Sequence, residues 1–209
     1  MEGTTIKEVK ELFGKNFIGK DELIPLMNKM GLNIENAVVP EINYSIENLK
    51  SYCKDYILIL GLPNVDKKDL SIKTFRELFG IDPEMQEPCF YNQDWYLKEN
   101  FIHSALANRW YLLKKEVVEE SRAVQPVDLL KQNIIFPSAI LCTYTFFAYY
   151  FLNNELLWYH DFVWCSDTDH NSDRIYVGKY HDIDGVNKNG FSIHRHLALR
   201  KCYGSIEIL

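Results

Sequence analysis

One apolar segment, from Ala139 to Leu152, constrains the fold of this chain more than any other part of it. Its sequence, AILCTYTFFAYYFL, is apolar nearly all round, so a helix formed by it must be buried on most of its faces. Ser138 stands where this helix would begin. Asn153 and Asn154 follow where it would end, because Asn tolerates the left-handed conformation of a helix C-cap. The rest of the chain must therefore fold around this helix.

The same region does not predict a membrane span. The most apolar window, Ile134 to Leu152, is interrupted by Pro137 and contains Ser, Thr and Tyr, so it is too short and too polar to cross a bilayer. We therefore expect no membrane partner and a helix that is covered by protein. Hydrophobic residues make up 47% of the chain, which is ample for such a core.

The residues after this helix favour β-structure. Short runs rich in aromatic and β-branched residues alternate with turns rich in Gly, Asp and Asn. The predicted strands are Leu156–Trp164, Arg174–Tyr180, Phe191–Leu199 and Tyr203–Leu209. Because helices dominate the earlier residues, the sequence predicts an α+β fold. It has a helix-rich N-terminal part and a mostly antiparallel C-terminal β-sheet packed on the long buried helix.

A ten-residue segment near the start of the chain occurs a second time in similar form. TIKEVKELFG, residues 5–14, is echoed by SIKTFRELFG, residues 71–80, and six of the ten positions are identical. Each copy has a hydroxyl N-cap, apolar residues at helical spacing and a final Gly that permits a left-handed stop. A hydrophobic strand follows each copy, at Tyr56–Leu60 and at Trp110–Leu113. We predict a degenerate helix–loop–strand repeat over residues 5–60 and 71–117; the alternative is a favourable helix sequence used twice.

A polar segment, VVEESRAVQP at residues 117–126, is the best candidate for a domain boundary, because it is polar and ends in Pro. The sequence thus predicts two parts. Residues 1–120 are helix-rich and contain the repeat, whereas residues 127–209 contain the long helix and the sheet. Further helices are predicted at Asp21–Met30, Ile46–Cys53 and Val127–Gln132.

Net charge and cysteine content restrict the location and the partners. With a net charge of −6 and a pI near 5.5, the chain lacks the basic surface with which nucleic-acid binders neutralise phosphates. Five cysteines, an odd number without any CxxC pair, are typical of reduced thiols rather than of a disulfide framework. No basic stretch followed by an apolar run opens the sequence. We therefore expect a cytoplasmic protein and disfavour nucleic acid as a partner.

The stretch from Glu155 to Phe191 holds the candidate site residues. Oxygen-bearing side chains occupy alternate positions in one of its turns, as at the start of an EF-hand-type loop, and this pattern favours Ca²⁺. The predicted metal ligands are Asp167, Asp169, Asn171 and Asp173. Ser172 stands where Gly normally permits the sharp turn, and no bidentate Glu closes the loop. The alternative is therefore a solvated hairpin turn, because turns use the same residue types.

A second acidic turn, ending at Gly190, has similar chemistry. Its candidate ligand-binding residues are Asp182, Asp184, Asn187 and Asn189. We expect both acidic turns to lie near one end of the predicted sheet. We therefore expect this second turn to contact a ligand or to supply further oxygens to a cation.

A metal-dependent hydrolase is the alternative function. Asp169-His170, then Asn187, then His196 approximate the DH…N…H spacing of HNH-like nucleases. In such sites one His activates water and the other groups hold a divalent cation against the scissile phosphate. The candidate catalytic residues are His170, Asn187 and His196, together with Asp169. This hypothesis requires residues 187–199 to form a helix; a strand there excludes it.

The run CSDTDHNSDRIYVG, residues 165–178, followed by Asp184-Gly-Val186, resembles the C-terminal part of some uncharacterised bacterial proteins. Those proteins carry C-type-lectin-like variable modules, on which diversity-generating elements act. The resemblance covers about the last fifty residues. It implies a β scaffold that binds a ligand through loops at one end, without chemistry. Ser172 stands where that pattern has Gly, and the closing strands lack its small-residue–Arg–Lys ending.

The sequence therefore predicts a non-enzymatic binding module that uses the acidic loops Asp167–Asp173 and Asp182–Gly190, with Ca²⁺ as the one cofactor that they favour. We expect the partner to be a protein or a small molecule. The Gly-rich phosphate loop, the GxSxG elbow and the HExxH helix of common enzyme classes are all missing from the sequence. The divalent-metal hydrolase is the alternative that stays open.

Overall fold

The computed structural model describes residues 4–180, 190–195 and 198–209. Its α-helices are α1 (Ile6–Phe13), α2 (Ile24–Lys29), α3 (Ile46–Tyr52), α4 (Ile72–Phe79), α5 (Pro126–Lys131) and α6 (Ala139–Asn153). Its 3-10 helices are η1 (Gly14–Asn16), η2 (Trp95–Lys98), η3 (Asn100–His103) and η4 (Glu119–Ser121). Its strands are β1 (Phe17–Ile18), β2 (Tyr56–Gly61), β3 (Asn64–Val65), β4 (Lys68–Asp69), β5 (Arg109–Lys114), β6 (Phe162–Thr168), β7 (Arg174–Tyr180), β8 (Gly190–His194) and β9 (Tyr203–Gly204).

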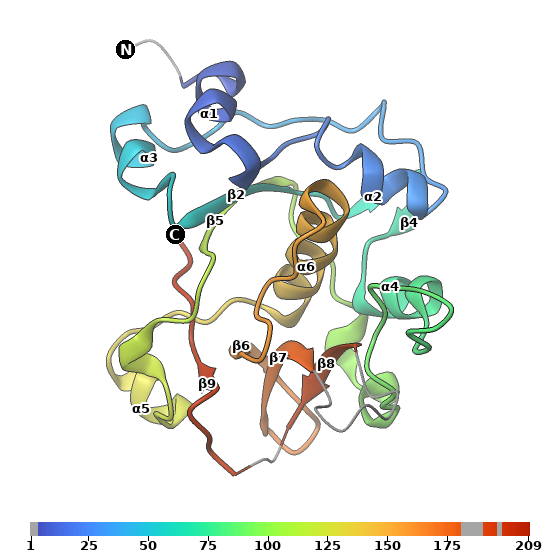
Figure 1. Cartoon of the computed structure of the whole chain (residues 1–209), viewed down its shortest axis with the longest axis vertical. Coiled ribbons are helices and arrows are strands. Elements are labelled where there is room, and N and C mark those ends of the chain that lie inside the picture. Colours follow the sequence, from blue (N-terminus) through green and yellow to red (C-terminus); the bar gives the residue numbers. More distant parts are fainter. Residues whose placement is uncertain (1–3, 181–189, 196–197) are drawn as a thin grey trace.

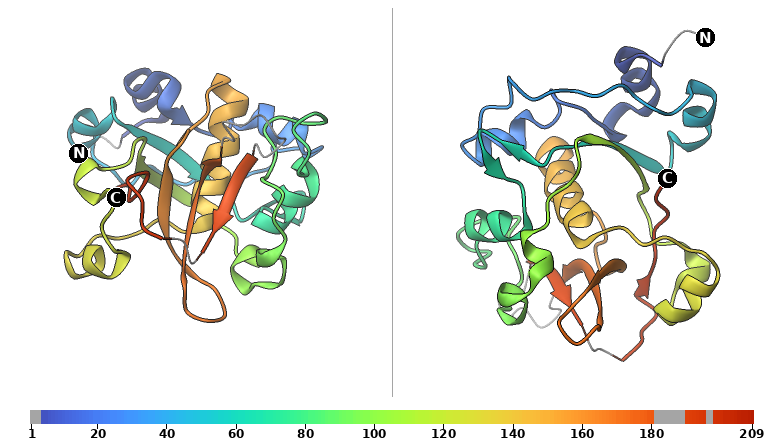
Figure 2. Two further views of the ribbon diagram at one scale, coloured as in Figure 1. Left: turned by 60° about the horizontal axis from the view of Figure 1, so that its bottom comes forward. Right: turned by 180° about the vertical axis from the view of Figure 1, so that it is seen from behind.

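The long apolar helix is α6, and it lies at the centre of the fold as predicted. Every residue from Ala139 to Tyr149 is buried. The Ser138 hydroxyl accepts a hydrogen bond from the Leu141 amide, and Asn154 ends the helix in the left-handed conformation. In Figure 1, α6 stands between β2 and β5 on one side and β6, β7 and β8 on the other, and the rear view in Figure 2 shows the same order. Two sheets and the N-terminal helices therefore provide the cover that an all-apolar helix requires.

The two larger sheets are built from different parts of the chain. One has the order β1-β2-β5, in which β2 and β5 pair antiparallel from Tyr56↔Lys114 to Gly61↔Arg109. The other has the order β8-β7-β6-β9, and its first three strands are antiparallel. The predicted α+β class with a mostly antiparallel C-terminal sheet is therefore confirmed. Among the described residues, no helix combines the length and hydrophobicity needed to cross a membrane.

The predicted strand Leu156–Trp164 is wrong in its first half. The strand β6 begins only at Phe162, because Trp158 (φ 50°) and His160 (φ 67°) have left-handed backbone conformations that no strand accommodates. Aromatic residues favour strands on average, so the sequence pattern predicts a strand where the structure has an irregular segment. This segment joins α6 to β6.

The predicted strand Tyr203–Leu209 is divided between the two sheets. Only Tyr203 and Gly204 pair with β6, and they do so in parallel. Farther on, Ile208 bridges to Leu113 of β5 in antiparallel orientation, and the Leu209 amide donates to the Leu112 carbonyl at 2.9 Å. The end of the chain therefore ties the C-terminal sheet to the N-terminal one.

The two echoed segments form the same local structure. Helices α1 and α4 both begin at a hydroxyl cap, Thr5 and Ser71, and both end at a Gly with positive φ. The strands that follow the two copies, β2 and β5, are neighbours in one sheet. Duplication of an ancestral unit stays a prediction, because good capping alone produces the same helices.

The predicted boundary at residues 117–126 is tied to the rest of the protein. The buried Ser121 hydroxyl accepts a hydrogen bond from the Ser205 amide at 2.7 Å, and the Val118 amide donates to the Ser205 carbonyl at 2.8 Å. One hydrophobic cluster contains residues from both sides of this segment. The division into residues 1–120 and 127–209 stays a prediction.

Candidate functional site

The turn between β6 and β7 is organised by the carboxylate of Asp169. One of its oxygens accepts hydrogen bonds from the Asn171 and Asp173 amides, both at 2.9 Å. Ser172 has a φ of 69°, the left-handed conformation for which a Gly is normally used. Burial alone would raise the pKa of Asp169, but the amides of Asp173 and Asn171 and the guanidinium of Arg195 lower it. The acidic turn therefore uses its central carboxylate to hold its own backbone.

The predicted calcium ligands do not converge on one point. Asp167 points toward α6, where its carboxylate accepts a hydrogen bond from the Ala139 amide at 2.6 Å. Burial raises the pKa of this carboxyl. Asp167, Asp169 and Asp173 form no group of converging ligand atoms in the described part of the chain, and Asn171 is exposed. Of these residues, Asp167 caps the start of α6 and Asp169 stabilises the β6–β7 turn.

The helix that the nuclease hypothesis requires is not formed at residues 190–194. These residues are β8, which pairs with β7 through Lys179↔Phe191 and Val177↔Ile193. Phe191 and Ile193 are buried, so the apolar alternation belongs to a strand. The remaining candidates of the second acidic turn and of the nuclease pattern lie outside the described residues: Asp182, Asp184, Asn187, Asn189 and His196.

The structure brings one unpredicted residue, Glu99, to the predicted His170. Glu99 lies between η2 and η3 and is only 6% exposed. One carboxylate oxygen accepts the His170 amide at 3.0 Å, and the other lies 2.6 Å from His170 Nδ1. Because a carboxylate only accepts, Nδ1 carries the hydrogen and Nε2 keeps its lone pair when the ring is neutral. The His170 side chain is nevertheless 63% exposed, so Glu99 orients a histidine that faces solvent.

Arg195 offsets part of the negative charge of this cluster. Its guanidinium bonds to the second oxygen of Asp169 and lies 3.8 Å from the Glu99 carboxylate. It also stacks over the Trp95 ring at 4.5 Å, while the Trp95 indole donates to the Ile193 carbonyl at 3.0 Å. Ligand atoms of Glu99, Asp169 and His170 all lie within 4.8 Å of one another. Segments far apart in the sequence therefore meet in one ionic cluster at this end of the sheet.

A cavity of about 430 Å³ opens beside the cluster. Three exposed polar side chains border it together with His170: Lys98, Asn100 and Thr168. Glu99, Asp169 and Trp95 complete its lining. The buried acids thus lie behind a border of exposed hydrogen-bonding groups.

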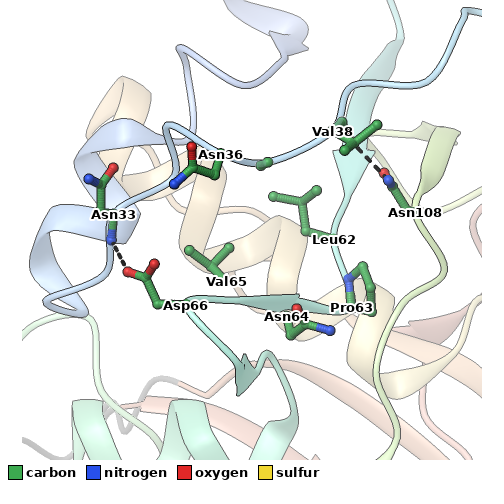
Figure 3. A pocket seen from close by; sticks show the side chains of 10 residues that line it. Asn33, Asn36, Val38, Leu62, Pro63, Asn64, Val65, Asp66 and Asn108 are labelled. Carbon is green, nitrogen blue, oxygen red and sulfur yellow. Dashed lines mark hydrogen bonds between the residues drawn. The ribbon is translucent and has the colours of Figure 1, made fainter.

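A smaller cavity, of about 240 Å³, lies beside the β3–β4 hairpin (Figure 3). Asp66 at its edge accepts a hydrogen bond from the Asn33 amide at 2.6 Å, and the Asn108 side chain donates to the Val38 carbonyl at 3.1 Å. These two bonds connect the irregular segment around residues 33–38 to the hairpin and to the start of β5. Because they serve the protein's own loops, this cavity is a weaker candidate than the one beside His170.

Sequence reasoning missed Glu99 because it lies 71 positions from His170 and carries no local motif. The comparisons add no further candidate. No protein-family model, no curated protein and no solved structure matches this chain, so the resemblance of its C-terminal residues to lectin-like modules stays a prediction.

Proposed function

We propose that this protein is a non-enzymatic binding module. Its ligand carries a carboxylate or phosphate group, which binds in the cavity beside His170. The observation that carries the proposal is that Lys98, which has no ion-pair partner among the described residues, borders the same cavity as His170, whose Nδ1 lies on Glu99 and whose Nε2 donates when the ring is protonated. Asn100 and Thr168 add neutral donors at the same border. Such donors suit a ligand that is rich in acceptor oxygens.

The two buried acids do not oppose an anionic ligand strongly. Asp169 is bonded to Arg195 and to two backbone amides, and Glu99 is bonded to His170. The same bonds argue against general-base catalysis by Asp169, because its lone pairs are already engaged and its pKa is lowered. Binding without chemistry is therefore the function that these contacts favour.

The test is a nuclear magnetic resonance titration with two probes, inorganic phosphate and acetate. We expect saturable shifts of the amide signals of Lys98, Asn100 and His170. Lys98→Gln should weaken binding by roughly tenfold or more, because a charge-assisted hydrogen bond contributes about 1.5–3 kcal/mol. The matched control is Lys73→Gln, which removes an exposed lysine of α4. Equal binding by both variants, or shifts spread over the whole surface, would refute the proposal.

A divalent cation is the second candidate, favoured by the mutual approach of Glu99, Asp169 and His170. A cation would have to displace the guanidinium of Arg195 from Asp169. A ligand that binds only the folded state raises the melting midpoint. CaCl₂ or MnCl₂ should therefore raise the midpoint, Arg195→Met should enlarge the rise, and Asp169→Asn should abolish it. An unchanged midpoint in the Arg195→Met variant would eliminate this candidate.

A further inference from the structure

Another cavity opens between β5 and the start of α6. Its volume is about 420 Å³, which falls within the range of about 300–1,000 Å³ that is typical of small-molecule sites. All the residues that line it are hydrophobic except Arg109, Ser138 and Ser166. A mostly apolar lining with a few polar groups is the usual composition of a site for a small organic ligand.

Two large aliphatic side chains that line this cavity are exposed to water. Ile135 is 67% exposed and Leu209 is 52% exposed. Three other lining residues, Leu112, Phe136 and Leu141, are buried in its walls. A ligand that covers the two exposed side chains would remove apolar surface from water, which is favourable in proportion to the area buried. The lining therefore fits an aliphatic chain.

The charge at this cavity comes from Arg109 of β5. Among the described residues that line the cavity, Arg109 is the only one with a charged side chain. Its guanidinium lies over the Tyr111 ring, 4.5 Å from the centroid, and the Tyr111 hydroxyl accepts the Ala107 amide at 3.1 Å. Because Tyr111 lines the same cavity, this cation–π contact holds the guanidinium beside it.

Two anionic groups next to this lining already have partners. The Asp167 carboxylate, which follows the lining Ser166 in the chain, accepts the Ala139 amide at 2.6 Å. An oxygen of Leu209 accepts the Tyr44 hydroxyl at 2.6 Å. In the described part of the chain Arg109 forms no ion pair, and its side chain is exposed. Its guanidinium can therefore pair with the anionic head group of a ligand, to which Ser166 can add a hydroxyl donor.

We infer that this cavity binds a monocarboxylic acid with an aliphatic tail. The carboxylate pairs with Arg109, and the tail packs on Leu112 and Leu141 and covers Ile135. A dianionic ligand would bury its second charge against apolar walls without a partner. An amine would meet Arg109 with a like charge. This site shares no lining residue with the cavity beside His170, so it does not depend on the function proposed for that cavity.

The test is a nuclear magnetic resonance titration with hexanoate, butyrate and hexylammonium. Hexanoate should shift the amide signals of Leu106 and Ile208, which line this cavity, in a saturable manner. It should bind about tenfold more tightly than butyrate, because it buries two more methylene groups. Hexylammonium has the same tail and the opposite charge, so it should bind at least roughly tenfold more weakly than hexanoate.

Arg109→Gln should weaken hexanoate binding by roughly tenfold or more, because it removes a charge-assisted contact. Arg200→Gln is the matched control, since Arg200 is also an exposed arginine and does not line the cavity. The inference is overturned if Leu106 and Ile208 show no saturable shift, if the two variants bind hexanoate equally, or if hexylammonium binds as tightly as hexanoate.

Discussion

Acidification should destabilise this protein through His194, the last residue of β8. Its ring stacks on Tyr176 with centroids 5.6 Å apart, contacts the ring of Phe162, and places Nδ1 3.1 Å from Gln93 Nε2. Because the amide nitrogen of Gln93 only donates, His194 Nδ1 accepts, and a proton on it would face a donor. Burial lowers the pKa of His194 from 6.5 to about 4.

The sign and the size of the effect follow from this pKa. Below pH 6.5 the His194 ring is protonated in the unfolded chain but stays neutral in the folded protein. The free energy of unfolding therefore falls as the pH decreases toward about 4. Each pKa unit corresponds to about 1.4 kcal/mol, so the full loss, reached below pH 4, is about 3.5 kcal/mol. Above pH 6.5 the ring is neutral in both states and the contribution is constant.

The assay is urea unfolding at a series of pH values, followed by tryptophan fluorescence, for the wild type and for His194→Gln. Titration of other groups, such as Asp167 and Asp169, is common to both proteins and cancels in the difference. Between pH 7 and pH 4 the wild type should lose about 3 kcal/mol more than the variant. Parallel pH profiles for the two proteins, or a ring titration near pH 6.5 by nuclear magnetic resonance, would refute the reasoning.

Other perturbations test the core and the site. Phe147→Ala should cost about 3–5 kcal/mol of unfolding free energy in urea, because the α6 ring stacks on neighbouring phenylalanines, the nearest 4.4 Å away. Gly178→Ala should cost about 3 kcal/mol in the same assay, since its Cβ would lie 1.9 Å from the Asp161 carbonyl oxygen; a variant of wild-type stability would contradict the β6–β7 register. Glu99→Gln should move the hydrogen of the neutral His170 ring partly from Nδ1 to Nε2, which ¹⁵N shifts of the ring report; an unchanged tautomer ratio would show that Glu99 does not orient the ring.

The sequence alone determined the α-helices because their signals are local. The Thr5 hydroxyl accepts the Glu8 amide and Gly14 ends the helix, all within ten positions of chain. The burial of α6 was equally readable, because a helix without a polar face has no stable exposed orientation. The alternation in Arg174–Tyr180 likewise predicted β7 with its observed bounds.

Strand boundaries depended on tertiary structure. Trp158 and His160 belong to residue types that favour strands, yet the connection from α6 to β6 holds them in left-handed conformations. The C-terminal residues Tyr203–Leu209 read as one strand, but their pairing partners belong to two sheets. Backbone pairing depends on which edge is available, and no single segment encodes that choice.

The candidate sites depended on tertiary structure even more. The acidic pattern at Asp167 and Asp169 drew attention to the β6–β7 turn, but spacing could not reveal that one carboxylate caps α6 and the other holds its own turn. The expectation that both acidic turns share one end of the sheet was wrong, because β7 is antiparallel to both of its neighbours and its length separates the turn before Arg174 from the residues after Tyr180. Glu99 and His170 meet only because η2 and η3 pack beside the β6–β7 turn, and Arg195 joins them from the end of β8. Neighbouring residues in the sequence determine local hydrogen bonds and periodicity, whereas the packing of the whole chain determines the partners of a buried charge.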